Sequence, residues 1–454
     1  MENFDEVKSK LNSVSSCFCL AKWTTVTLHL ESGTTHSCHH PRVHEIPVEE
    51  LVGNPSALHN TLFKIQQRDQ MMKGDRPAEC GYCWNIEDLG GEEISDRVIK
   101  SSAPYSMAVL DKIVADPLNN KFTPKYVEVS FSHACQFKCS YCSGNFSTTW
   151  EEEINKFGLY HNKHGEKYTK TYKEEENPYI AAFWDWWPDL KKELHTFRIT
   201  GGEPLLSPNT FKVLQSLIDQ PQPNLHLSIN SNLGAPPVLV DKFISLASTL
   251  LENKSVGMLD VYTSIDAFGA RAEYIRHGLN HNVFWDNIEK LLTANNKIKV
   301  IVMCTFNALS ITSFLDLLKK IREMNVKYKN TERWIALEID IAYLRHPFHQ
   351  TVQVLTENYV QEMEDIISFI SENQLSLHEE KSGFHQMHLI KSKRILEWMK
   401  SGLSEDLKKE YQKDFYLFFT EHDRRRGTNF LKAFPELQSF WEHCKSLAQP
   451  TQAV

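Results

Sequence analysis

Three closely spaced cysteines could ligate an iron–sulfur cluster. Cys135, Cys139 and Cys142 follow an apolar segment at residues 126–131 with the spacing CX3CX2C. Three thiolates in one loop can ligate three irons of a [4Fe-4S] cluster and leave the fourth iron open to another ligand. The alternative is zinc, which in structural sites has four protein ligands and would need a further group such as His133. The spacing favours the cluster.

Further polar residues come at the ends of later apolar segments. In chain order they are Gly201, Gly202, Glu203 and Pro204, then Ser228 and Asn230, then Ser264 and Arg276. Because the carboxyl ends of parallel strands meet at one end of a barrel, we expect these residues to lie near the cysteine loop. The two glycines would let the backbone approach a ligand closely.

These motifs, in this order, resemble the radical S-adenosylmethionine (SAM) superfamily. The resemblance implies that SAM chelates the open iron at Cys135, Cys139 and Cys142, and that electron transfer to SAM gives a 5′-deoxyadenosyl radical. It also implies SAM contacts from Gly201, Gly202, Glu203 and Pro204 (amino group), Tyr141 (adenine), Ser228 and Asn230 (ribose), and Ser264 and Arg276 (ribose and carboxylate). Ordinary packing at strand ends is the alternative for Tyr141, Ser228 and Asn230.

A second group of cysteines precedes the first. Cys19 and Cys38 are spaced CX13GX4C, and Cys80 and Cys83 form a CX2C pair. This pattern resembles the auxiliary-cluster region of SPASM and twitch proteins, here in the group with an N-terminal twitch domain, and implies a second [4Fe-4S] cluster. Cys17 competes with Cys19 as a ligand. The alternative metal is zinc, held by four cysteines or with help from His36, His39, His40 or His44.

The elements that must position these residues alternate between strands and helices. Strands are predicted at 126–131, 197–200, 225–229, 259–265, 299–304 and 335–341, and helices at 210–218, 238–251, 283–292 and 311–324. Six such alternations predict an α/β fold with parallel strands, a partial (β/α)6 TIM-like barrel of the radical SAM type. Before it, we expect a strand at 24–30, a hairpin turn at 31–33 and a helix at 54–73. The expected domains are an auxiliary-cluster domain (1–100), the barrel (122–345) and a helical C-terminal region (346–454).

Other features have simpler structural interpretations. The polar segment at 147–177 is interpreted as a solvated loop, with a lid over the barrel as the alternative. Cys304 lies in an apolar strand and is interpreted as a buried free cysteine, with hydrogen donation to a substrate radical as the alternative. Residues 183–187 are expected on the buried face of the first barrel helix, and Arg424 to Arg426 in a solvated turn.

Composition limits the remaining possibilities. The 454 residues carry 58 acidic and 50 basic side chains, and this net charge of -8 argues against a dedicated nucleic-acid binder. Residues 1–22 lack the apolar region of a signal peptide and no segment is apolar for long enough to span a bilayer, so we expect a cytoplasmic protein. Eight of the ten cysteines precede residue 143, which in a reducing compartment indicates metal chemistry rather than disulfides.

We therefore expect a two-cluster radical SAM oxidoreductase or modifying enzyme. Its relatives in the SPASM and twitch subgroup imply a peptide or protein side chain as substrate. The alternative substrate is a small molecule such as a sugar or nucleotide, and the alternative of another class is a non-catalytic Fe–S binding protein. A reductant such as flavodoxin or ferredoxin is the expected partner.

Overall fold

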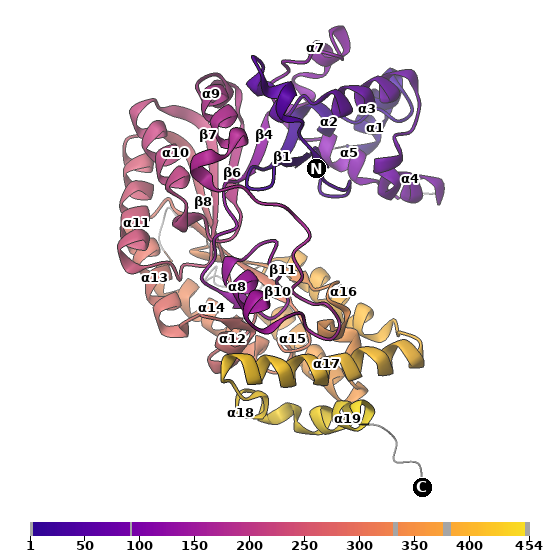
Figure 1. Cartoon of the computed structure of the whole chain (residues 1–454), viewed down its shortest axis with the longest axis vertical. Coiled ribbons are helices and arrows are strands. Elements are labelled where there is room, and N and C mark those ends of the chain that lie inside the picture. The colour runs from indigo at the N-terminus through magenta and orange to yellow at the C-terminus, as the bar shows by residue number, and fades with distance from the viewer. Residues whose placement is uncertain (1–2, 91–92, 330–334, 376–382, 450–454) are drawn as a thin grey trace. The chain divides into compact units, whose positions relative to one another are not determined.

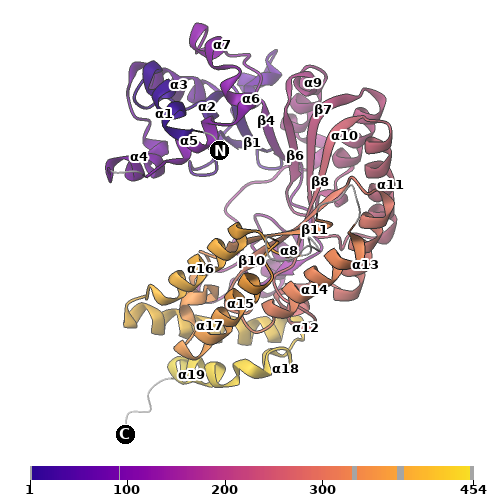
Figure 2. The ribbon, with the colours of Figure 1, turned by 180° about the vertical axis from the view of Figure 1, so that it is seen from behind.

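The computed structural model describes residues 3–90, 93–329, 335–375 and 383–449. Two compact units form, whose elements can be followed by colour in Figures 1 and 2. The first comprises Met1–Ser132, Thr169–Ile229 and Asn253–Met258, and the second comprises His133–Tyr168, Asn230–Glu252 and Leu259–Val454. This division differs from the expected boundaries of three domains, which stay predictions.

The first unit contains a mostly parallel sheet. Its strands are β1 (Thr25–His29), β2 (Thr34–His36), β3 (His44–Glu45), β4 (Tyr126–Ser130), β6 (Thr196–Thr200) and the larger part of β7 (Gln222–Ser231). Strands β1, β4, β6 and β7 are parallel neighbours in that order, while β2 pairs antiparallel with β1 and with β3. The expected N-terminal strand and hairpin turn are thus confirmed, and β1 extends the parallel sheet beyond β4.

The two faces of this sheet differ in polarity. Because side chains alternate along a strand, Val127, Val129, Phe197 and Ile199 share one buried face. The register places Glu128, Arg198 and Ser228 side by side on the opposite face. Thr27 of β1 pairs with Glu128 and continues this polar row. An apolar face under helices and a polar inner face are what a barrel with a functional lumen requires.

Helices cover the apolar face and build the N-terminal region. They are α1 (Phe4–Val14), α2 (Ala21–Thr24), α3 (Leu62–Lys73), α4 (Gly81–Asp88), α5 (Asp96–Ser101), α6 (Pro104–Met107), α7 (Leu110–Ala115), α9 (Pro178–Glu193) and α10 (Pro208–Asp219). In α9, Phe183 packs edge-on against Phe131 at 5.1 Å, and Trp187 lies 4.8 Å from the Phe197 ring. The expected buried aromatic face of this helix is confirmed.

The second unit repeats the strand–helix alternation. Its strands are β8 (Val256–Ser264, of which 259–264 belong to this unit), β10 (Lys299–Phe306) and β11 (Leu337–Tyr343), with a separate pair β5 (Lys138–Cys139) and β9 (Arg276–His277). Strand β10 is parallel to both β8 and β11. Its helices are α8 (Thr148–Phe157), α11 (Pro237–Glu252), α12 (Ala270–Ile275), α13 (His281–Ala294), α14 (Phe314–Tyr328), α15 (Val360–Glu372), α16 (Gln386–Lys400), α17 (Glu405–Arg426), α18 (Phe430–Ala433) and α19 (Gln438–Ala448).

The expected fold class is confirmed. Each of the six predicted strands is present, as β4, β6, β7, β8, β10 and β11, and the four predicted helices are α10, α11, α13 and α14. After β11, the described residues form helices and no named strand. The α/β class with a helical C-terminal region therefore holds. None of the described helices has the length and hydropathy needed to cross a bilayer.

Two predictions of local structure are wrong. The segment at 147–177 contains a full helix, α8, because Ser147 caps its N-terminus by accepting from Trp150 N at 3.3 Å and Trp150 is fully buried. The helix predicted at 54–73 begins only at Leu62, where Thr61 accepts from Lys64 N at 3.2 Å. A separate 3-10 turn, Pro55–Leu58, precedes it.

Candidate functional site

The backbone of the loop with the three cysteines is held by side chains from outside the loop. Five of its carbonyls, those of residues 135 and 137–140, accept hydrogen bonds from side chains. The donors are Thr148 Oγ1, Ser147 Oγ, Arg426 Nη1, Trp150 Nε1 and Gln350 Nε2, at distances of 3.3, 2.7, 2.6, 2.9 and 3.0 Å respectively. Because so many carbonyls are satisfied, the loop is ordered by the protein itself and presents its thiols in a fixed arrangement.

A short antiparallel strand pair also holds this loop. Strand β5 pairs antiparallel with β9, and the register sets Cys139 opposite Arg276. Gly278 follows with φ +110°, and a Cβ there would lie 2.9 Å from the buried Phe137 ring. Only glycine therefore lets the two segments approach this closely.

Burial shifts the acidity of two of the three thiols. Burial raises the pKa of the Cys142 thiol to about 12 and also raises the pKa of Cys139. Two polar side chains point at the sulfurs: Asn232 Nδ2 is 3.8 Å from Cys135 Sγ, and Arg276 Nη1 is 3.7 Å from Cys139 Sγ. His133, the possible fourth zinc ligand, instead bonds Glu151 at 3.2 Å. Metal binding here would release protons from the thiols.

Asp266 is the centre of a buried network beside these cysteines. Its Oδ1 accepts from Thr305 N at 2.8 Å and from Arg276 Nη2 at 3.0 Å. Its Oδ2 accepts from Tyr141 OH at 2.7 Å and lies 2.8 Å from Arg276 Nε. Both charged side chains are buried. Tyr141 and Arg276, expected to contact SAM, are therefore brought together with Cys139 through a carboxylate that sequence reasoning did not identify.

The Gly201–Pro204 motif is shaped by contacts within the first unit. Gly201 has φ +125°, and a Cβ there would lie 2.6 Å from Ser132 O and 2.8 Å from Ser130 Oγ. Gly202 N donates to Ser132 O at 3.1 Å. Glu203 is buried, and its Oε1 accepts from Leu205 N at 3.0 Å, which caps the 3-10 turn Pro204–Leu206. The motif thus lies tightly against the chain that leaves β4.

The remaining predicted SAM contacts lie at strand ends, as expected from the sequence. Ser228 is buried and pairs with Arg198 in the β6–β7 register, and Asn230 lies two residues beyond it. Ser264 ends β8 opposite Met303. Cys304, one residue beyond Met303, is 2% exposed, and its sulfur is 4.0 Å from Asp266 O.

The thiols of Cys38, Cys80 and Cys83 all lie within electrostatic range of Cys19. Burial raises the pKa of the Cys80 and Cys83 thiols to about 12, and the neighbouring Cys19 acts in the same direction on both. Burial also raises the pKa of Cys38, again with Cys19 as a neighbour. Cys17 is directed elsewhere, because its sulfur lies 3.1 Å from Asp75 O and 3.6 Å from Met71 O.

A histidine pair borders this group. Among the described residues, His39, His40 and Asp96 offer ligand atoms within 4.8 Å of one another. His40 Nε2 is 2.7 Å from Asp96 Oδ2, whereas the Lys100 ammonium lies 3.1 Å from His39 Nδ1. A pocket of about 370 Å³ begins here and extends over the polar face of the sheet. Its lining includes His36, Cys38, His39, Lys100, Tyr105, Tyr126 and Glu128.

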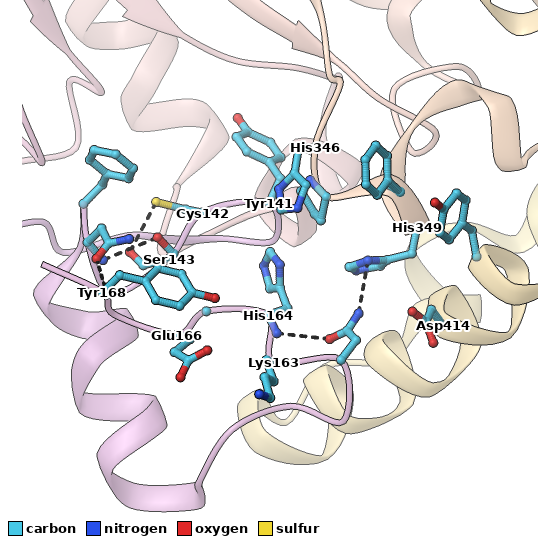
Figure 3. Close-up of a pocket in the computed structure, with 17 residues that line it drawn as sticks. Tyr141, Cys142, Ser143, Lys163, His164, Glu166, Tyr168, His346, His349 and Asp414 are labelled. Carbon is cyan, nitrogen blue, oxygen red and sulfur yellow. Dashed lines mark hydrogen bonds between the residues drawn. The ribbon is translucent and has the colours of Figure 1, made fainter. Parts of the chain in front are cut away.

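A second pocket, of about 480 Å³, is lined in part by Cys142 (Figure 3). Tyr141 and Cys142 border it on one side, and Lys163, His164 and Glu166 contribute from the segment after α8. Burial lowers the pKa of His164 to about 3, so its imidazole is neutral. This pocket thus borders the loop with the three cysteines, within the second unit.

Sequence reasoning missed the residues that hold the loop. Arg426 was expected in a solvated turn, but its side chain is fully buried, and it bonds Lys138 O and pairs with Glu153. Gln350 reaches Ser140 from a position 210 residues away. A signal existed for α8, since Ser147, Thr148 and Thr149 precede an amphipathic run and form a typical helix N-terminus. No comparable local signal marks Arg426 or Gln350.

Two comparisons with known proteins cover the part of the chain that carries these residues. A family model described as the radical SAM superfamily matches residues 129–321, which include the cysteine loop and the Gly201–Pro204 motif. A GTP 3′,8-cyclase from Sulfurimonas denitrificans is 24% identical over 207 residues, which cover 45% of this chain and 54% of that protein. The chain therefore spans about half the length of that relative. Residues 129–321 therefore match the radical SAM superfamily of enzymes, and the loop with the three cysteines lies within the matched residues.

Proposed function

We propose that this chain is a two-cluster radical SAM enzyme that abstracts hydrogen from an unreactive carbon of its substrate. The match of residues 129–321 to the radical SAM superfamily implies a [4Fe-4S] cluster and SAM. When bound, the cluster supplies the electron that cleaves SAM to methionine and a 5′-deoxyadenosyl radical. The residues proposed to hold it are Cys135, Cys139 and Cys142. The observation that carries this proposal is the loop with the three cysteines, whose backbone carbonyls accept five hydrogen bonds from side chains outside the loop.

The donor set fits this cluster better than zinc. Three thiols belong to the loop, and His133, which would complete a zinc site, is bonded to Glu151. An open iron needs only three protein ligands, whereas a structural zinc needs four. We place SAM against Gly201, Gly202, Glu203 and Pro204 and against Tyr141, Ser228, Asn230 and Ser264. The backbone of Gly201 supports this placement, since its conformation and close contacts exclude any side chain.

We further propose that Cys19, Cys38, Cys80 and Cys83 hold the auxiliary [4Fe-4S] cluster. Their mutual electrostatic influence supports this set, and the contacts of Cys17 with Met71 and Asp75 support Cys19 over Cys17. Lys22 lies beside them: burial alone would lower its pKa, but Cys80 and Glu79 outweigh this effect and raise it. A buried cation is suited to balance the negative charge of a four-thiolate cluster. Zinc at this site is the rival hypothesis.

Two substrate classes follow from the family resemblance: a peptide or protein side chain, and a small molecule such as a sugar or nucleotide. Two observations favour the small molecule. The relative is a cyclase whose name gives GTP as its substrate. The pocket of about 370 Å³ beside Cys38 is lined by Glu128, Lys100 and two tyrosines, which suits a compact polar ligand. A flavodoxin or ferredoxin reductant and a cytoplasmic location complete the proposal.

The test is SAM cleavage by the anaerobically reconstituted protein with dithionite. Wild type should release 5′-deoxyadenosine, and the triple variant Cys135→Ala, Cys139→Ala, Cys142→Ala should release none. Cys444→Ala, which removes a buried cysteine of α19, is the matched control and should behave as wild type. Mass spectrometry of products from candidate peptides and from nucleotides or sugars then separates the two substrate classes. Cleavage by the triple variant would exclude this function.

A further inference from the structure

The guanidinium of Arg276 is aimed at a cysteine sulfur by the local backbone. The β5–β9 register sets Arg276 directly opposite Cys139, and Ser140 N donates to Ile275 O at 2.7 Å beside this pair. From this position Arg276 Nη1 reaches to 3.7 Å from Cys139 Sγ. The side chain is 8% exposed, so little water competes for this contact.

Asp266 prevents the guanidinium from turning away. Its carboxylate accepts a hydrogen bond from Arg276 Nη2 at 3.0 Å and forms an ion pair with Nε at 2.8 Å, although Nε is not aligned to donate a hydrogen bond. The carboxylate is itself fixed by Thr305 N and Tyr141 OH. Because a planar guanidinium held along one edge has a defined orientation, its Nη1 is left directed at the sulfur.

A hydrogen-bond donor beside a ligand sulfur changes the reduction potential of an iron–sulfur cluster. Hydrogen bonds to ligand sulfurs and nearby positive charge stabilise the more negative, reduced state of an iron–sulfur cluster and so raise its reduction potential. Burial strengthens such an effect, because the local dielectric is low. Asp266 carries the opposite charge, but three hydrogen-bond donors neutralise part of it: Thr305 N, Tyr141 OH and Arg276 Nη2. The Nη1 that contacts Cys139 is the guanidinium nitrogen that does not contact Asp266.

We propose that Arg276 is a positioning residue that raises the reduction potential of the cluster held at Cys139, with Asp266 fixing its orientation. This inference rests on the proposed function, since it needs Cys139 as a cluster ligand. It differs from the role that the family resemblance implies for Arg276, which is contact with the SAM carboxylate. The two roles make different predictions for the protein without SAM.

The experiment is a redox titration, followed by electron paramagnetic resonance, of reconstituted protein in the absence of SAM. The signal of the SAM-binding cluster is identified as the one that changes when SAM is added. Arg276→Gln removes the charge and should shift the reduction equilibrium toward the oxidised cluster roughly tenfold, or about 59 mV for a one-electron couple. Arg276→Lys keeps the charge but loses the planar fork and should give a smaller shift in the same direction. Arg271→Gln, which breaks a surface pair with Glu436, is the control and should give no shift.

Iron content and SAM affinity are measured on the same samples. Arg276→Gln should keep the wild-type iron content, and its shift in potential without SAM should appear whether or not SAM affinity changes. An unchanged potential with weaker SAM binding would overturn the proposal and assign Arg276 to the SAM carboxylate. Loss of the cluster from both Arg276 variants would overturn it in favour of a structural role. If wild type holds no cluster at this loop, the proposed function itself fails.

Discussion

Arg426 and Glu153 form an ion pair that is withdrawn from solvent, with Nε 3.0 Å from Oε2 and side chains 0 and 1% exposed. The pair joins the last turn of α17 to α8. Arg426 also donates to Lys138 O at 2.6 Å, and its guanidinium lies 4.6 Å from the centre of the Trp150 ring. The C-terminal helical region is thereby tied to the loop that carries the proposed cluster ligands.

Removing Arg426 should therefore destabilise the protein and loosen the loop. Arg426→Ala removes one of two cations that pair with the buried Glu153 and leaves Lys138, 2.9 Å from its Oε2, so the cost should be about 2–3 kcal/mol, below the roughly 3–5 kcal/mol of a fully unpaired buried charge. We expect urea unfolding to show a loss of this size, together with a lower iron content after reconstitution. Arg424 offers a matched control on the same helix turn, since its side chain is 59% exposed and pairs with Glu421. Arg424→Ala should change the unfolding free energy by less than about 1 kcal/mol; equal losses in the two variants would contradict this role.

The same pair also makes Glu153 sensitive to acid. Burial alone would raise its pKa, but Arg426, together with hydrogen bonds from Lys138 and Tyr160, outweighs burial and lowers the pKa to about 2. A carboxyl whose pKa is lower in the folded state stabilises the protein at pH values above its pKa in the unfolded state, near 4.5. This stabilisation is lost as the pH falls toward the folded-state pKa of about 2. Glu153→Gln should accordingly flatten the fall in stability over this pH range, measured by thermal unfolding between pH 5 and pH 3.

The fold was predictable from sequence where periodicity is local. Strands β4 and β6 alternate apolar and polar residues, and their helices α9 and α10 show one apolar face, so the parallel α/β class follows from patterns of fewer than about twenty residues. The segment with α8 was misinterpreted because its charges, at Glu151 and nearby, dominate its composition. Their pairing with Lys167 and Arg426 depends on distant segments and leaves no local pattern.

The candidate site residues that form local sequence motifs were also predictable. The three cysteines and the Gly201–Pro204 motif are visible because ligand type and spacing are local features. Asp266 follows Ser264 in the printed sequence, yet its role depends on Thr305, Tyr141 and Arg276 meeting around one carboxylate. Such convergence comes from the tertiary structure, and spacing along the chain does not encode it.

Gly201 should tolerate no side chain. Its φ of +125° is strained for other residues, and a Cβ would also approach Ser132 O to 2.6 Å. Strain of about 1–3 kcal/mol and a steric cost of similar size are expected for Gly201→Ala. SAM affinity, measured by equilibrium dialysis, should fall as well. Gly74 is the control: its φ is +85° but no atom lies within 4 Å of its Cβ position, so Gly74→Ala should cost about 1 kcal/mol and leave SAM affinity unchanged. Normal SAM binding by Gly201→Ala would argue against the placement of SAM at this motif.

Glu31 should make the protein less stable as pH rises. Its carboxyl is buried, and burial raises its pKa to about 7, while His29 lies 3.8 Å away. Between about pH 4.5 and pH 7 the unfolded state binds fewer protons at this position than the folded state, so stability falls with pH in this window and the full cost applies above it. Glu31→Gln should gain up to about 3 kcal/mol relative to wild type at pH 8 and little at pH 4. The exposed Glu49 provides the control, since Glu49→Gln should leave the pH dependence unchanged.

The last prediction concerns the metal content of the N-terminal cysteines. Two [4Fe-4S] clusters correspond to about eight irons in the reconstituted wild type. Cys38→Ser should lower this to about four, because it removes one of four ligands and leaves the loop at Cys135 intact. The remaining cluster should still change its electron paramagnetic resonance signal when SAM is added.

Cys17 supplies the discriminating control for this prediction. Cys17 and Cys19 are two residues apart, yet the Cys17 sulfur lies near the carbonyls of Met71 and Asp75. Cys17→Ser should therefore keep about eight irons, whereas Cys19→Ser should lose about half of them. If Cys17→Ser lost about half of the irons and Cys19→Ser kept them, Cys17 would be the ligand in place of Cys19. Four thiolates can bind either zinc or an iron–sulfur cluster, so element analysis of natively purified wild type must decide between them. One zinc and about four irons per chain would show that the N-terminal cysteines hold zinc.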